Sequence, residues 1–232
     1  MKINTIILSL TLSFVTLTSL ITCSNYRLQK LKTELTHENL LSSDIHYKDI
    51  GLSFNGNSLV LYNVSHSKYS TLTARRMQLE NTPSQFRLIL TGVHGSLTSY
   101  FQHYAPLSVE EKIFDYNPNK DLLENPLLTL AILGYDILNV DIHISAIQKG
   151  PNQIVYDLIV QEQGHVKARF SAKLKPIPSS KTMWDNLKQQ PVLIYLTYLD
   201  PKLKQRLDAY TSSKQLPFIT EKNPFAFSLL QK

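Results

Sequence analysis

The sequence has few of the residues on which several classes of protein depend. It contains a single cysteine in 232 residues, so neither a disulfide framework nor a cysteine-ligated zinc site can form within one chain. Only 7 glycines are present, which disfavours a glycine-rich phosphate-binding enzyme. Charged residues make up 18% of the chain and hydrophobic residues 43%. That composition supports a sizeable core and excludes wholesale disorder.

The charge pattern gives little support to nucleic-acid binding. The chain has 24 Lys and Arg residues against 18 Asp and Glu, a formal net charge of +6. The basic residues are scattered, with the densest stretches at 27–32 and 202–206, and no helix-turn-helix or zinc-finger spacing occurs. We therefore expect no nucleic-acid partner, and the mild positive charge is better matched to an anionic membrane surface.

Recognisable catalytic and metal-binding motifs are also missing. The 7 histidines form no His-Glu-x-x-His pair, and no Gly-x-Ser-x-Gly elbow occurs. An enzyme would need the fold to assemble a polar cluster from distant residues, such as His94, His103 and Glu110. His143 and His165 could similarly meet across strands. We expect the protein to have no enzymatic activity, no metal site and no cofactor.

The chain does have a long uncharged run near its start. A short basic stretch precedes residues 3–22, which carry no charge and are rich in Ile and Leu. This layout is typical of a secretory signal, and about 20 residues are also just enough to span a bilayer. Residues 1–24 are therefore predicted to be a signal peptide or a membrane anchor. In a bacterial host, either would place the remaining residues in the periplasm, tethered to the inner or outer membrane unless the signal is cleaved.

The single cysteine, Cys23, lies at the end of this run. The sequence Leu20-Ile21-Thr22-Cys23 resembles a bacterial lipoprotein box, in which the cysteine becomes the acylated first residue of the mature protein. Thr22 departs from that pattern, because Gly, Ala or Ser is usual there. Three outcomes stay open: lipid attachment at Cys23, an uncleaved anchor, or cleavage after Ser24.

Residues 44–232 are predicted to form a single β-rich α+β domain, preceded by a helical spacer over 25–43. Apolar residues alternate with a period of two between short turns, which is typical of antiparallel meanders. Two meanders, at about 45–95 and 135–175, are expected to form a curved sheet with a few packing helices, one of them a very apolar helix at 126–133. The predicted strands are 45–52, 58–64, 71–80, 86–93, 135–147, 153–162, 165–175 and 192–199.

Two further helices are predicted near the end of the chain. Ser179 or Ser180 is expected to cap a short one. Asp200 followed by Pro201 is a typical helix start, with an aspartate N-cap and a proline in the first turn. The second helix is expected over 202–210, and its residues facing the sheet would be Leu203, Leu207 and Tyr210. On the solvent side, a small basic patch suited to a membrane surface would be formed by Lys202, Lys204 and Arg206.

The strand pattern resembles a group of bacterial envelope proteins, the AsmA-like and YdgA-like proteins. The stretches that carry the resemblance are Tyr47-x-x-Ile50, Leu59-x-Leu61-x-Asn63-Val64 and Ala74-Arg75-Arg76-x-x-Leu79. The resemblance implies a periplasm-facing, membrane-tethered β-rich protein with a role in envelope upkeep. Some larger members are thought to handle lipids through a curved sheet with an apolar concave face. The resemblance assigns no functional residue.

Two functions follow as expectations. The first is a non-enzymatic, membrane-tethered envelope protein that binds a lipid in an apolar groove. The alternative is a protein–protein interaction module of the envelope with an ordinary closed core. The apolar segments are compatible with both, and an open groove lined only by apolar side chains would favour the first.

Overall fold

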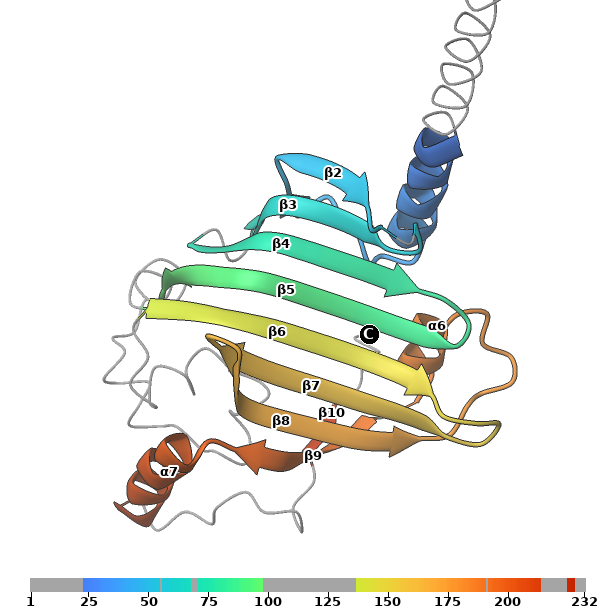
Figure 1. The fold of residues 1–232 in the computed structure, drawn as a ribbon. Helices are drawn as coiled ribbons and strands as arrows, with labels where there is room; N and C mark the ends of the chain where they lie inside the picture. The colour runs from blue at the N-terminus through green and yellow to red at the C-terminus, as the bar shows by residue number, and fades with distance from the viewer. Residues whose placement is uncertain are drawn as a thin grey trace, which may run out of the picture.

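The computed structural model describes residues 23–54, 56–67, 71–97, 137–190, 192–213 and 225–227. Within these residues the chain forms one ten-stranded sheet and three helices (Figure 1). The helices are residues 23–37, α6 (Met183–Lys188) and α7 (Pro201–Ser213). The strands are β1 (Ile45–His46), β2 (Asp49–Leu52), β3 (Leu59–His66), β4 (Leu72–Asn81), β5 (Gln85–Ser96), β6 (Ile137–Gln148), β7 (Ile154–Glu162), β8 (His165–Leu174), β9 (Val192–Leu199) and β10 (Phe225–Phe227).

The expected antiparallel, sheet-dominated α+β fold is confirmed. The strands pair in the order β1-β3-β4-β5-β6-β7-β8-β9-β10, and β2 also pairs with β3. The two meanders are parts of one sheet, because β5 pairs with β6 from Gln85 opposite Ile147 to Ser96 opposite Ile137. The predicted helix at 126–133 lies outside the described residues.

The membrane segment expected at the start of the chain is likewise not described, apart from residues 23 and 24. Among the described residues, the structure contains no helix that is both long and apolar enough to cross a membrane. The signal or anchor therefore stays a prediction.

One face of the sheet carries the core. The strand register places apolar residues from neighbouring strands side by side, and alternation along each strand keeps them on one face. One such row runs from β4 to β9 through Leu79, Leu88, Ile144, Leu158, Phe170 and Leu196. The short helix α6 lies behind the sheet in Figure 1, and β9 and β10 curl toward the same side.

Helix α6 begins later than the sequence indicates. Its N-cap is Thr182, whose Oγ1 accepts a hydrogen bond from the backbone N–H of Asp185 at 3.2 Å. The predicted caps, Ser179 and Ser180, are wrong because the chain is still turning there: the N–H of Ser180 donates to the carbonyl of Ile177 at 3.1 Å. The helix then buries Met183 and Leu187 in the core.

The segment predicted as a spacer is packed onto the sheet. Helix 23–37 ends before residue 43, and Leu35 and Leu41 belong to the buried core. Glu38 forms an ion pair with Lys188 of α6, with 3.6 Å between Oε2 and Nζ. These contacts join the segment to the domain that it precedes, so it is more than a bare spacer.

Asp200 caps helix α7 as predicted. Its Oδ1 accepts hydrogen bonds from the backbone N–H groups of Lys202 at 3.0 Å and Leu203 at 3.4 Å. Leu203 is buried, in agreement with the expected inner face. The side chains of Leu207 and Tyr210 lie outside the described part of the structure.

Replacing Asp200 with alanine is expected to lower the free energy of unfolding by about 1 kcal/mol, the usual cost of a lost N-cap. Asp200→Asn is the control, because an asparagine caps a helix about as well. Urea denaturation of the three proteins measures the effect. If both variants lose the same stability, the stabilising contribution of Asp200 comes from its ion pair with Lys167, with 3.7 Å between Oδ2 and Nζ, and not from the helix cap.

Candidate functional site

A half-buried apolar band crosses the core face of the sheet. It is formed by side chains from five consecutive strands that pack against the buried core but are themselves only partly buried. We call this band the apolar strip, and its residues are Leu88, Leu90, Ile142, Ile144, Leu158, Val160, Ala168 and Leu196. Every member is aliphatic, so the strip offers no group for acid–base or nucleophilic chemistry.

In β5 and β6, buried residues of the same face lie on both sides of the strip. On the side of α6, Phe86, Ala146 and Tyr156 are buried. On the other side, Val93 and Val140 are buried as well. In β5 and β6, partial exposure is therefore confined to the residues between these two ends. Five strands spaced about 4.8 Å apart make the strip about 19 Å long, longer than the roughly 15 Å of hydrocarbon in one bilayer leaflet.

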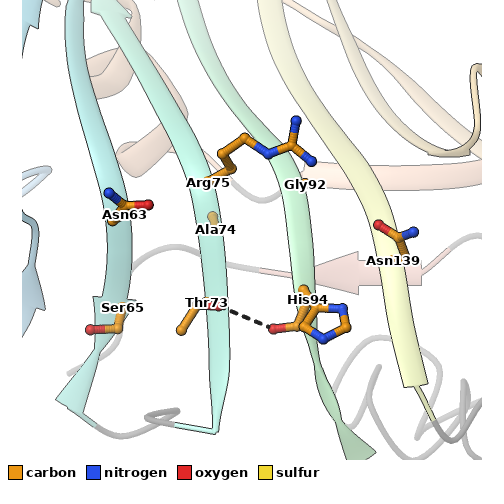
Figure 2. Close-up of a pocket in the computed structure, with 8 residues that line it drawn as sticks. All are labelled: Asn63, Ser65, Thr73, Ala74, Arg75, Gly92, His94 and Asn139. Atoms are coloured by element: carbon orange, nitrogen blue, oxygen red, sulfur yellow. Dashed lines mark hydrogen bonds between the residues drawn. The ribbon is translucent and has the colours of Figure 1, made fainter.

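The opposite face of the sheet carries a polar hollow of about 540 Å³ near one end of β3 to β6 (Figure 2). Among the described residues, its lining combines one arginine and one histidine with several neutral hydrogen-bonding side chains. We call it the polar hollow, and its residues are Asn63, Ser65, Thr73, Ala74, Arg75, Gly92, His94 and Asn139.

Irregular backbone in two of the four strands shapes this hollow. Asn63 in β3 and Gly92 in β5 both have left-handed backbone conformations, with φ of 51° and 62°. The pairing of β5 with β6 shifts register between Leu90 and Val93, around Gly92. The N–H of Gly92 donates to Oδ1 of Asp141 at 2.6 Å, which satisfies a backbone group that the bulge removes from the ladder.

Gly92 also makes room for the side chain of Arg75. A Cβ atom at position 92 would lie 3.2 Å from Cβ and 3.3 Å from Nε of Arg75. Figure 2 shows the arginine reaching from β4 across Gly92. Two separate constraints, the positive φ and this close approach, therefore call for glycine here.

Replacing Gly92 with alanine is expected to lower the free energy of unfolding by about 1–2 kcal/mol, because alanine is strained in a left-handed backbone conformation. A further loss is expected because the side chain of Arg75 must move to make room for the added Cβ. Thermal denaturation should show a Tm lower by about 2–4 °C per kcal/mol. Gly164→Ala is the matched control, since Gly164 has φ +80° but no neighbouring atom within 4 Å of the added Cβ. An equal Tm loss in both variants would contradict the close approach of Arg75.

The structure places the predicted membrane-contacting residues apart from these two features. Lys202, Lys204 and Arg206 are exposed on α7. Cys23 is an exposed free thiol at the beginning of the described helix 23–37. The roles predicted for these residues, in membrane-surface contact and in lipid attachment, stay predictions.

The histidines considered from the sequence do not form a shared site in the described residues. His143 lies opposite Ile159 in β7, whereas His165 lies opposite Glu162, so the register does not bring the two histidines together. His94 lines the polar hollow, while the partners proposed for it, His103 and Glu110, lie outside the described residues. No group of three or more His, Cys, Asp or Glu side chains in the described ranges is arranged to hold a metal ion.

The polar hollow was not foreseen from the sequence. Alternation along β6 does indicate that Asn139 and Asp141 face away from the core, but the hollow combines residues of four strands whose register is set by tertiary pairing. The local signals were a glycine and an asparagine within strands, positions that often mark a bulge or a left-handed residue.

Comparisons with protein-family models, with curated proteins and with solved structures find no match to this chain. The resemblance to AsmA-like and YdgA-like proteins therefore stays a prediction.

Proposed function

We propose that this protein is a membrane-tethered, non-enzymatic component of the bacterial cell envelope that binds the acyl chain of a lipid along the apolar strip. The observation that carries the proposal is the partial exposure of eight aliphatic side chains on one sheet face, flanked on both sides by buried residues in β5 and β6. Covering apolar surface is favourable by about 25 cal/mol per Å², so an acyl chain lying on the strip would be held without any polar contact.

The N-terminal part of the chain supports a location beside a membrane. The uncharged run 3–22 leads directly into helix 23–37, whose Leu35 is packed into the domain. A tether at this point would hold the sheet close to the bilayer. The exposed basic residues of α7 would add attraction to anionic headgroups.

Photolabelling with a diazirine-bearing fatty acid tests the acyl site. The full chain is placed in phosphatidylcholine nanodiscs, irradiated and digested, and the labelled peptides are identified by mass spectrometry. We expect label on peptides of β5, β6 and β7. Leu88→Trp should reduce this label about tenfold, because a displacement cost of about 1.4 kcal/mol changes occupancy by that factor.

Ile89→Trp is the matched control, since Ile89 is the next residue in β5 and points to the opposite face. It should leave the labelling unchanged. Label confined to residues 1–22, or lost equally in both variants, would contradict acyl binding by the strip. Capture of another protein on an unlabelled strip would favour an interaction module instead.

The proposed membrane tether can be tested separately from the acyl-chain site. Cell fractionation is expected to recover the protein with the membranes. If Cys23 is acylated, incorporation of an alkyne-bearing palmitate is lost in Cys23→Ala. If residues 3–22 form an uncleaved anchor, the variant remains in the membrane fraction at full-length mass without label. Recovery of the full-length chain in the cytosol would contradict both forms of the tether.

A further inference from the structure

The polar hollow lies on the face of the sheet opposite the apolar strip. His94 follows the buried Val93 in β5, and Asn139 precedes the buried Val140 in β6. Because alternate residues of a strand point to opposite faces, the hollow and the core face are separated by the sheet itself. A lipid on the strip cannot reach the hollow, so a ligand bound there would be a different molecule.

The charge of the lining is positive. Arg75 is exposed and forms no ion pair with any residue in the described ranges. No carboxylate is among the lining residues that the structure describes. Asp141, whose Oδ1 accepts the N–H of Gly92, is not among these lining residues. A planar guanidinium with unused donors is suited to a carboxylate or phosphate group, which it can bind through two parallel hydrogen bonds.

The arginine lies against the backbone of Gly92. Its Nε and Nη2 lie 3.3 and 3.4 Å from the position that a Cβ of residue 92 would occupy, so the side chain rests against the glycine backbone. This contact narrows the space that the side chain can sample, so binding costs it less conformational entropy than a freely rotating side chain would lose.

The neutral lining residues suit hydroxyl groups. Thr73 donates to the backbone carbonyl of His94 at 3.5 Å, whereas Asn63, Ser65 and Asn139 use no side-chain hydrogen bond within the described part of the chain. Amides and hydroxyls both donate and accept, as the hydroxyls of a sugar require. The hollow, about 540 Å³, also falls within the roughly 300–1,000 Å³ typical of small-molecule sites, far more than a bare oxyanion needs.

We propose that the polar hollow binds a sugar-sized anion, with its carboxylate or phosphate group on Arg75 and its hydroxyl groups on the neighbouring asparagine, serine and threonine side chains. This site is independent of the acyl-chain site, and either can exist without the other.

Isothermal titration calorimetry of the full chain in phosphatidylcholine nanodiscs tests the proposal, with glucose 6-phosphate, glucuronate and uncharged glucose as probes. We expect at least one of the two anions to bind and glucose to bind at least tenfold more weakly, since the charge-assisted contact is lost. Binding of only one anion identifies the oxyanion that the hollow prefers. Absence of binding by both anions at millimolar concentration would overturn the proposal.

Arg75→Gln should weaken binding of the anion about tenfold or more. Arg87→Gln is the control, because Arg87 is a half-buried arginine of β5 that faces away from the core and lies outside the hollow. Asn139→Asp, at an exposed position, adds a negative charge to the lining and should also weaken binding. If Arg75→Gln and Arg87→Gln weaken anion binding equally, the loss reflects only the lower net charge of the protein. That result would overturn the assignment of Arg75 as the residue that binds the anion.

Discussion

Replacing Phe86 with alanine is expected to lower the free energy of unfolding by about 3–5 kcal/mol. Phe86 is 2% exposed, and its ring stacks on that of Trp184 with 5.0 Å between centroids. The substitution removes the buried ring, leaves a cavity and ends the stacking contact between the sheet and α6. Because Phe86 closes the α6 end of the apolar strip, the same change should loosen that end of the face.

Urea denaturation followed by tryptophan fluorescence measures this loss at the site itself, since Trp184 is the single tryptophan of the chain. Phe54→Ala is the matched control: it deletes the same atoms from a fully exposed side chain and should change the stability by less than about 0.5 kcal/mol. Similar losses in the two variants would show that the stacking of Phe86 on Trp184 contributes little.

The strands could be predicted because their signals are local. Alternation over 135–147 and the polar turn after it closely matched β6 at Ile137–Gln148, and Asp200 followed by Pro201 correctly marked the start of α7. A period of two, a turn residue or a cap depends only on nearby residues. The confirmed parts of the fold are therefore those that neighbours in the sequence determine.

The candidate sites depend on strand register, which is not local. Nothing in the sequences of β5 and β6 alone shows that they pair, since 40 residues separate Ser96 from Ile137. The alignment of Leu88 with Ile144 along the strip follows from that pairing. The bulge at Gly92 and the resulting position of Arg75 also depend on it. Sequence periodicity tells which residues face the core, but it cannot tell which of them stay half-exposed once all strands are paired.

Raising the pH through the range from about 10 to 12 is expected to destabilise the protein through Tyr156. This residue lies on the core face of β7, and burial raises the pKa of its hydroxyl from 10.0 to about 12. In that range the unfolded chain releases the phenolic proton while the folded chain retains it. The unfolded state then binds fewer protons, so the free energy of unfolding falls as the pH rises. A difference of 2 pKa units corresponds to about 3 kcal/mol.

The stability that Tyr156 contributes in this way is fully present below pH 10 and is lost as the pH rises through 12. The chain has 12 tyrosines and many lysines that titrate in the same range, so the test is the difference between the wild type and Tyr156→Phe. Urea denaturation at several pH values between about 8 and 12 should give a shallower decline in the variant, because phenylalanine has no proton to release. Parallel declines in the two proteins would mean that the hydroxyl of Tyr156 ionises as readily in the folded chain as in the unfolded one, and that water reaches this end of the core face.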